Sequence, residues 1–430
     1  MEAKHRVVIL GGGFGGLYAA KALKNAPVQV TLLDRRNFHL FQPLLYQVAT
    51  GSLSPGEIAS PLRSILHRQQ NTQVLLGEAK DLDTAGRRVI LDSGELEYDT
   101  LIVATGSTDS YFGHDDWARY APGLKSIEHA TEIRGKILYA FEAAEKETDP
   151  EKRREWLTFV LVGAGTTGVE LAGALGEIAH DTLRNDFRSI RPEEAQIILL
   201  EGGPRVLPSY PGDLSAKAKA SLIRLGVQPR TDVLVTGIDD GGVTVKTQQG
   251  EERIAARTVI WSAGVRPSPF AQVLERQAGA KLDRRGQVMA ASDCSVAGHP
   301  EIFVIGDLAH FEQDGKPLPG VAQVAMQQGG YVAKLIRARL TGKPSAPFRY
   351  FDKGSLAVIG RAAAVAQIGP LHMSGLLAWL TWLFVHLMYL VEFSNRILVF
   401  VQWGFLYLTF SRGARLITDS GTPRASSASR

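Results

Sequence analysis

The stretch Val7-Val8-Ile9-Leu10-Gly11-Gly12-Gly13-Phe14-Gly15-Gly16 decides the fold of the first part of this 430-residue chain. Its four apolar residues predict a buried strand, and the glycines that follow have the spacing G-x-G-x-x-G. In this motif the first glycine permits a tight turn, the second lets the backbone approach a pyrophosphate, and the third lets the helix pack on the strand. Asp34 ends the next apolar run, 18 residues past Gly16, close to the ~20 expected for a carboxylate that binds a ribose hydroxyl.

A second stretch repeats the pattern: Phe159-Val160-Leu161-Val162-Gly163-Ala164-Gly165-Thr166-Thr167-Gly168. Its acid is Glu201, 33 residues past Gly168, and a polar insertion over 184–194 explains the longer spacing. Either motif alone could be an ordinary glycine-rich turn. Together they indicate two bound dinucleotides, as electron transfer between a nicotinamide and a flavin requires. The predicted fold class is α/β, with two Rossmann-like dinucleotide-binding domains followed by a C-terminal membrane-anchoring helical segment.

Composition excludes several other classes of protein. The net charge of +4 is too small to indicate binding to nucleic acid. The single cysteine, Cys294, excludes an internal disulfide and a Cys-x-x-Cys redox pair. The N-terminus runs directly into the first strand, so we expect no secretory signal and a cytoplasmic catalytic part.

The order of the strands predicts a chain that leaves the first nucleotide domain, builds the second, and returns to finish the first. Leu101–Val103 is a predicted strand ending at Ala104-Thr105-Gly106, and Thr258–Trp261 is the expected last strand of the second domain. Ile302–Ile305 is a further strand with Gly306-Asp307 at its carboxyl end, where ligands collect in such sheets. A charged helix is expected over 128–155. The first nucleotide domain is predicted over 1–120 and 285–345, and the second over 155–270. A membrane-associated region is predicted over 346–411, followed by a flexible basic tail at 412–430.

The C-terminal region is apolar and rich in tryptophan. Residues 362–391 contain no Asp, Glu, Lys or Arg, and a second apolar run covers 397–410. A spanning helix needs ~20 apolar residues, so these runs favour two helices lying in the headgroup layer over a transmembrane hairpin. Arg412 and Arg415 would then form a basic flank facing lipid headgroups. A dimer interface on the same face is compatible with either arrangement.

These motifs resemble the two-dinucleotide-binding flavoprotein superfamily, and in particular its type II (alternative, non-proton-pumping) NADH:quinone oxidoreductases. The narrower likeness comes from Phe38-His39-Leu40-Phe41-Gln42-Pro43-Leu44-Leu45-Tyr46-Gln47-Val48-Ala49, from Ala322-Gln323-Val324-Ala325-Met326-Gln327, and from the apolar C-terminal segment. The resemblance implies FAD in the first domain and NADH in the second. It also implies electron transfer to a membrane quinone (ubiquinone or menaquinone), peripheral attachment to lipids at the cytoplasmic face of the inner membrane, and a homodimer.

The resemblance also assigns residues. The implied FAD residues are Gly11, Gly13, Phe14, Gly15, Gly16, Asp34, Tyr46, Ala79, Thr105, Gly106, Gly306, Asp307, Ala322 and Gln323. The implied NADH residues are Gly163, Gly165, Gly168, Glu170, Glu201 and Gly264. The implied catalytic residues are Glu170, Gln323, Gln327 and Lys353, and no metal is expected. Glu201 favours NADH over NADPH because a carboxylate repels a 2′-phosphate, although the nearby Arg205 would offset that repulsion.

Each catalytic residue has a structural alternative. Gln323 and Gln327 are four apart on a helix expected over 321–340, so they share one face and would line the quinone pocket, unless they are solvated. The positive end of that helix would face charge on the reduced flavin. Glu170 would relay a proton or contact the nicotinamide, unless it is a plain helix acid. Lys353 would stabilise reduced flavin or protonate quinone, unless it belongs to a surface turn.

Two other functions remain open from the sequence. A soluble NAD(P)H-dependent reductase of an iron–sulfur protein shares both nucleotide domains but has no use for the apolar C-terminal segment. An NADH-sensing flavoprotein would oxidise NADH slowly. Sulfide:quinone oxidoreductase chemistry is excluded, because it needs paired cysteines.

Overall fold

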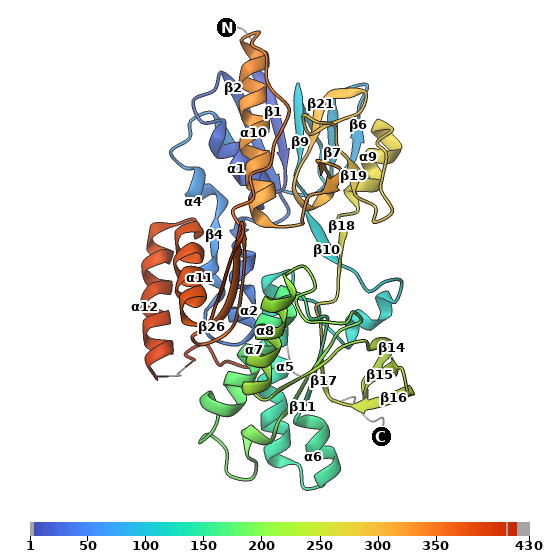
Figure 1. The fold of residues 1–430 in the computed structure, drawn as a ribbon. Coiled ribbons are helices and arrows are strands. Elements are labelled where there is room, and N and C mark those ends of the chain that lie inside the picture. Colours follow the sequence, from blue (N-terminus) through green and yellow to red (C-terminus); the bar gives the residue numbers. More distant parts are fainter. Residues whose placement is uncertain (1–3, 410–411, 419–430) are drawn as a thin grey trace. The chain divides into compact units, whose positions relative to one another are not determined.

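The computed structural model describes residues 4–409 and 412–418, and the predicted tail beyond residue 418 lies outside them. The chain divides into two discontinuous units, drawn in Figure 1. Unit 1 takes its described residues from 1–40, 59–108 and 265–353, and unit 2 takes them from 41–58, 109–264 and 354–430. The segment 41–58, which the sequence places in the first nucleotide domain, therefore clusters with the second.

Unit 1 is built on a six-stranded sheet in the order β20-β21-β9-β1-β2-β5, parallel except for β20. The strands are β1 (His5–Leu10), β2 (Val28–Asp34), β5 (Thr72–Leu76), β9 (Thr100–Val103), β20 (Ser295–Val296) and β21 (His299–Val304). Helices α1 (Phe14–Ala22) and α10 (Ala322–Leu340) lie side by side in Figure 1. They touch so closely that a Cβ at Gly329 would lie 2.3 Å from the carbonyl oxygen of Gly15.

Alternate residues of the same strands, such as Val8, Leu101 and Ile302, bury their side chains with α9 (Phe270–Ala278) and an antiparallel sheet. That sheet consists of β6 (Ala79–Asp83), β7 (Arg88–Leu91) and β8 (Glu95–Glu97). Shorter elements complete the unit: β3 (Phe38–Leu40), β4 (Ala59–Pro61), α4 (Leu62–Leu66), β19 (Val288–Met289), β22 (Ala309–His310), β23 (Glu312–Gln313) and β24 (Lys316–Pro317). Where the chain passes between units, β10 (Ser107–Asp109) pairs with β18 (Val265–Pro267).

Unit 2 contains a four-stranded parallel sheet in the order β13-β12-β11-β17. Its strands are β11 (Thr158–Val162), β12 (Gln196–Leu200), β13 (Val227–Arg230) and β17 (Thr258–Trp261). Its larger helices are α5 (Ile127–Lys146), α6 (Pro150–Trp156), α7 (Thr166–Glu177) and α8 (Gly212–Arg224). An antiparallel sheet of β14 (Leu234–Asp239), β15 (Gly242–Thr247) and β16 (Gly250–Ala255) adjoins them. The helix expected over 128–155 is two helices, because Asp149 caps α6 by accepting the Glu151 N–H and Pro150 begins it.

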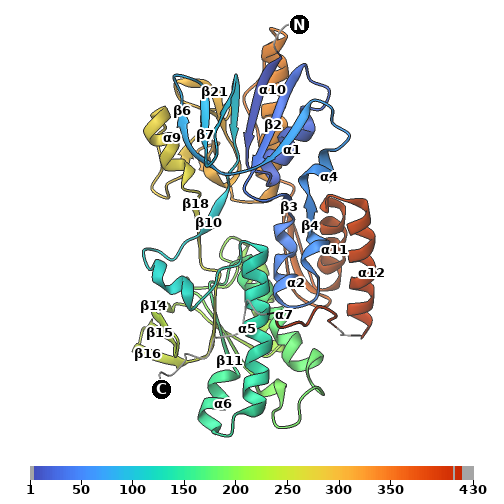
Figure 2. The ribbon, with the colours of Figure 1, turned by 180° about the vertical axis from the view of Figure 1, so that it is seen from behind.

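The C-terminal part of unit 2 begins with a small antiparallel sheet that the sequence does not predict. It comprises β25 (Ser355–Gly360), β26 (Ala363–Ile368) and β27 (Leu371–Ser374). Strand β25 packs on α7 so closely that a Cβ at Gly173 would lie 1.7 Å from the carbonyl oxygen of Ile359. Helices α11 (Leu376–Tyr389) and α12 (Phe393–Thr409) follow as a hairpin, side by side in Figures 1 and 2. No helix within 4–409 and 412–418 is both long and apolar enough to cross a membrane.

The segment 41–58 forms α2 (Leu45–Ala49) and α3 (Pro55–Ile58). Asn395 on the inner face of α12 donates to the Gly56 carbonyl at 3.4 Å. The inner face of the hairpin is therefore packed against this segment.

Candidate active site

The first glycine loop has the geometry that its motif predicts. Gly11 has φ +100°, and a Cβ there would lie 2.4 Å from the Ala104 carbonyl oxygen. A Cβ at Gly16 would lie 1.8 Å from the carbonyl oxygen of Gly11. At Gly13, by contrast, a Cβ would meet nothing within 4 Å. Any side chain at Gly11 or Gly16 would clash, whereas Gly13 opens onto space in which a pyrophosphate could approach the backbone.

Asp34 orders this loop itself. Its carboxylate accepts the Gly12 N–H at 2.5 Å and the Arg36 N–H at 2.7 Å, and burial raises its pKa. A carboxylate has about four lone-pair positions, so it retains capacity for a ribose hydroxyl. The Nδ1 of His39 donates to the Gly12 carbonyl at 2.9 Å, and burial lowers the pKa of His39 to about 4. Phe14 meets the His39 ring edge-on, with centroids 5.1 Å apart.

The carboxyl ends of the neighbouring strands β9 and β21 bring two more predicted turns to the same edge of the sheet. Asp307 accepts a hydrogen bond from Ser107 Oγ at 2.7 Å, and the hydroxyls of Thr105 and Ser268 lie 2.6 Å apart. The Gly306 N–H donates to Oε1 of Gln328 at 2.8 Å, and the Gln328 side chain is buried. Gln328 therefore ties α10 to the Gly306-Asp307 turn.

The sequence does not single out Gln328, because it stands next to Gln327 and only burial distinguishes the two. Ala322 begins α10, as expected for the helix predicted over 321–340. Ala79 begins β6 and packs against the core of unit 1. Contacts of these two residues with FAD remain predictions.

The second glycine loop repeats the geometry of the first. A Cβ at Gly163 (φ +99°) would lie 2.4 Å from Ala263 Cα, and one at Gly168 would lie 1.8 Å from the Gly163 carbonyl oxygen. A Cβ at Gly165 again meets nothing within 4 Å. Both units thus carry a cradle that fits a dinucleotide pyrophosphate.

The acid of the second loop also repeats the first. Glu201 accepts the N–H groups of Ala164 and Gly203, each at 2.8 Å. The predicted NADH residue Gly264 lies under the ring of Phe112, which would be 2.6 Å from a Cβ at that position. Arg205 donates to the Pro208 carbonyl at 2.9 Å.

Glu170 lies on α7 in a buried chamber of unit 2. Its side chain accepts the Val358 N–H at 3.4 Å, and burial raises its pKa to about 8. Because that value lies above neutral pH, the carboxyl group is largely protonated at pH 7. A cavity of about 20 Å³ adjoins it, enough for about one water molecule. The lining residues are Tyr46, Gln47, Ser52, Glu170, Ala174, Glu177, Val358, Ile359, Gly360, Arg361, Leu406, Tyr407 and Arg412.

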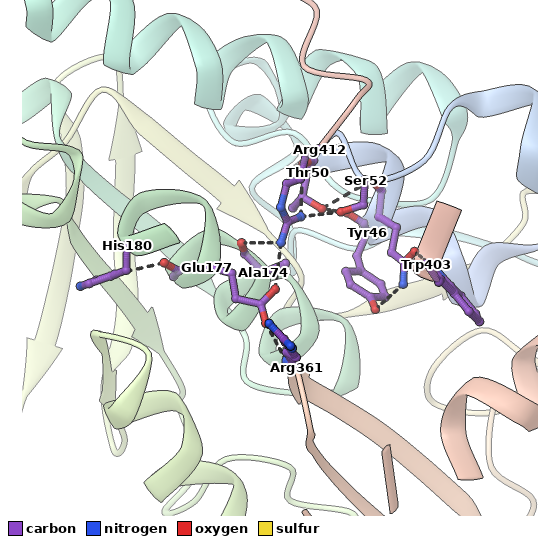
Figure 3. Close-up of polar contacts among 11 residues, drawn as sticks. Tyr46, Thr50, Ser52, Ala174, Glu177, His180, Arg361, Trp403 and Arg412 are labelled. Atoms are coloured by element: carbon purple, nitrogen blue, oxygen red, sulfur yellow. Dashed lines mark hydrogen bonds and ion pairs between the residues drawn. The ribbon is translucent and has the colours of Figure 1, made fainter. Parts of the chain in front are cut away.

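Tyr46 and Gln47 reach this chamber from α2. Gln47 donates through Nε2 to the Tyr46 hydroxyl at 2.8 Å and accepts the Trp403 indole N–H at 2.7 Å. Figure 3 shows this contact between Trp403 of α12 and the residues of α2. Tyr46, which the family resemblance assigns to FAD, therefore packs in unit 2.

The predicted glutamine pair does share one face of α10. Gln327 pairs with the backbone of Phe351, accepting its N–H at 3.0 Å and donating to its carbonyl at 2.9 Å. Gln323 accepts the Lys353 N–H at 3.1 Å. The two side chains therefore bind the segment that carries Lys353, which brings three of the four predicted catalytic residues together in unit 1.

The predicted lipid-facing basic flank is wrong for Arg412. This residue is buried and pairs with Glu177 at 2.9 Å, while Arg415 pairs with Asp186 at 2.5 Å. The Arg412 side chain donates hydrogen bonds to the turn 50–52 and to α7, both in unit 2. Arg412 therefore does not belong to a flexible tail. The sequence could not show this, because an arginine after an apolar run has the same pattern whether it faces lipid or protein.

Comparison with known proteins identifies the family. Residues 5–329 match the family described as pyridine nucleotide-disulphide oxidoreductase, and residues 353–412 match the NDH2 C-terminal domain. The type II NADH:quinone oxidoreductase Ndh of Mycobacterium tuberculosis is 48% identical over 424 residues, covering 97% of this chain and 91% of that protein. The chain belongs to the type II NADH:quinone oxidoreductase family. NdhA of the same organism, a second protein of this type, is 47% identical over 426 residues, covering 97% and 90% of the two chains.

Solved structures share the fold of this type II family member. NDH2 of Plasmodium falciparum in complex with NADH aligns with a TM-score of 0.86 at 20% identity, covering 96% of this chain and 99% of that one. Sulfide:quinone oxidoreductase of Aquifex aeolicus aligns with a TM-score of 0.73 at 18% identity, covering 94% and 95%. All the predicted NADH residues lie in unit 2, and all the predicted FAD residues except Tyr46 lie in unit 1.

Proposed function

We propose that this chain oxidises NADH through bound FAD and passes both electrons to a membrane quinone. The observation that carries the proposal is the pair of glycine loops with matching geometry and matching carboxylates, one in each unit. When bound, FAD accepts the two electrons of NADH and gives them to the acceptor. Unit 1 would hold FAD through Asp34 and Asp307, and unit 2 would hold NADH through Glu201.

The protein's own groups supply charge and protons. The N-terminal end of α10, at Ala322, has no side-chain cap and presents a positive dipole end suited to the reduced flavin. Gln323 and Gln327 fix the segment of Lys353, whose ammonium would add positive charge on the acceptor side. The overall reaction, NADH + H⁺ + quinone giving NAD⁺ + quinol, takes one proton from solvent. Glu170 would hold that proton on its carboxyl oxygen.

The C-terminal hairpin would bring the site to its apolar substrate. The exposed face of α11 carries Leu376, Leu377, Leu380, Phe384 and Met388, each about half or more exposed. The opposite face buries Trp379 and Trp382. A helix with its large apolar residues on the solvent side is suited to lie in a lipid interface. We propose peripheral attachment at the cytoplasmic face of the membrane, and a homodimer remains a prediction from the family resemblance.

Stopped-flow spectroscopy of the purified holoprotein tests this function. NADH should bleach the flavin absorbance, and ubiquinone or menaquinone analogues should restore it over many turnovers. Rapid reduction by NADH without reoxidation by either quinone would refute the function. In that case an iron–sulfur protein acceptor or a sensing role would be favoured, although the exposed apolar hairpin argues against a soluble reductase.

A further inference from the structure

A buried cation, Arg412, binds the described residues after α12 to the turn 50–52 and to α7, and the Ala414 N–H donates to the Gly51 carbonyl of the same turn at 3.1 Å. Arg412 donates through Nη1 to Ser52 Oγ at 2.5 Å and to the Thr50 carbonyl at 3.3 Å. Through Nη2 it donates to Glu177 Oε2 at 2.9 Å and to the Ala174 carbonyl at 3.4 Å. Figure 3 shows the guanidinium between the turn after α2 and the end of α7. Only 3% of the Arg412 side chain is exposed.

The site is better suited to an arginine than to a lysine. Glu177 and the Ala174 carbonyl lie in the last turn of α7, just before the π-helical turn Ile178–Thr182 that continues it, and both present oxygen acceptors to the cation. The planar fork of a guanidinium can bind two acceptors on each side at once, whereas a lysine ammonium is a single point charge. Arg412 therefore joins α7 to the turn 50–52 with one side chain.

That turn fixes the position of α2. Thr50 Oγ1 donates to the Tyr46 carbonyl at 2.9 Å, and the Ser52 N–H donates to the Gln47 carbonyl at 2.8 Å. Gln47 is also held by Trp403 of α12. Two residues from the C-terminal hairpin and its continuation, Trp403 and Arg412, thus hold the α2 residues that face the chamber of Glu170.

We propose that Arg412 is a positioning residue for quinone: it holds α2, with Tyr46 and Gln47, against α7, with Glu170. The proposal rests on the proposed function and specifies which residues set its acceptor half-reaction. A quinone leaving the lipid at the hairpin would meet α2 on the inner face of that hairpin. The glycine loop predicted to bind NADH lies at the opposite end of α7, so loss of Arg412 should weaken quinone use and spare reduction by NADH.

The test must separate positioning from stability. Arg412→Met leaves the buried Glu177 carboxylate without its cation, which is strongly destabilising for buried pairs. The double variant Arg412→Met/Glu177→Gln removes both charges and retains an amide oxygen to accept the Arg361 N–H, which Glu177 Oε1 accepts at 2.6 Å. Asp186→Asn is the matched control, since it breaks the nearby Arg415–Asp186 pair and leaves intact the bond that Arg415 Nε donates to the Arg412 carbonyl at 3.1 Å.

FAD content, the rate of flavin reduction by NADH, and the KM and kcat for a quinone analogue would be measured in liposomes. We expect the double variant to bind FAD and be reduced by NADH within about twofold of wild type, while its KM for quinone rises about tenfold, which corresponds to ~1.4 kcal/mol. Arg412→Lys should give an intermediate KM, and Asp186→Asn should match wild type. A folded double variant with the KM of the control would overturn the proposal, as would an equal loss of both half-reactions. If wild type itself fails to reduce quinone, the proposed function fails instead.

Discussion

The proposed membrane attachment should be weakened by changing three residues on the exposed face of α12. Phe393, Phe400 and Leu408 are 74%, 64% and 80% exposed. Their spacing of seven and eight residues places them on one side of the helix. The opposite face buries Asn395, Val399 and Trp403, so serine at the three exposed positions leaves the packing of the hairpin on unit 2 intact. Truncation of the hairpin would be less informative, because it would also remove Arg412.

The expected magnitude follows from the exposed fractions. Full burial of a Phe or Leu side chain contributes about 1.5–3 kcal/mol. Scaled by exposures of 64–80%, each side chain contributes about 1–2 kcal/mol on entering lipid, or about 3–6 kcal/mol for the three. Since each 1.4 kcal/mol corresponds to a factor of about ten, the triple variant should bind liposomes at least a hundredfold more weakly.

Flotation of the holoprotein with liposomes measures this change directly. A matched control replaces Leu76, Ile223 and Leu234 with serine, since these residues are 66%, 56% and 61% exposed and lie outside the hairpin. The control should float like wild type. If the α12 variant floats equally well, the hairpin is not the attachment surface. If it instead changes from dimer to monomer and still floats, the exposed face is a subunit interface.

Three further outcomes follow from the site. The pKa of Glu170 is about 8 in the folded protein, against an ordinary 4.5, so between these pH values the folded state keeps a proton that the unfolded state releases. The free energy of unfolding therefore falls as pH rises from about 4.5 to about 8, by up to roughly 5 kcal/mol. Glu170→Gln should therefore gain thermal stability relative to wild type between about pH 6 and about pH 9, and a difference independent of pH would contradict the burial argument. Gln328→Leu removes the acceptor of the Gly306 N–H and should weaken FAD binding about tenfold, since a lost buried hydrogen bond costs about 1–3 kcal/mol. The release of flavin on dilution measures this loss of affinity. Unchanged retention of FAD would show that the Gly306-Asp307 turn keeps its position without Gln328. The structure has room for a side chain at Gly13 and at Gly165, so Gly13→Val and Gly165→Val should fold, with the valine occupying the space expected for a pyrophosphate. Gly13→Val should yield colourless protein. Gly165→Val should keep FAD yet resist reduction by NADH. Loss of FAD in both variants would contradict the assignment of one cofactor to each unit.

The local parts of the fold could be predicted from the sequence, and the long-range parts could not. The glycine loops were predictable because each requirement lies within a few residues, as at Gly11 and Gly16. The helix over 321–340 was predicted to within a residue. The sheet β25–β27 was missed because its alternation merges into the apolar run that follows. The inclusion of 41–58 in unit 2 depends on contacts with the distant helices α5, α7 and α12, which no local pattern contains.

The candidate site shows the same division. Asp34 was predicted as a ligand residue from its spacing and Glu201 from its place at the end of a strand, but their bonds to loop N–H groups required the structure. Arg412 was assigned to the lipid surface because, in the local sequence, a positive charge after an apolar run is typical of a helix end at a membrane interface. Its true partner, Glu177, lies 235 residues away. Burial of this pair is a property of the packed chain rather than of either sequence neighbourhood.

The proposed NADH-binding role of Glu201 is coupled to a structural role, which limits how the coenzyme preference of this enzyme can be redesigned. The usual route to NADPH replaces such an acid with a small or basic residue. Here the same carboxylate also accepts the N–H groups of Ala164 and Gly203. Replacing Glu201 would therefore leave both N–H groups without this acceptor, in the turn that the new coenzyme must use. A successful redesign will need a second substitution that returns two acceptors to that turn. The equivalent hydrogen bond, which the Gly12 N–H donates to Asp34, imposes the same condition on the first glycine loop.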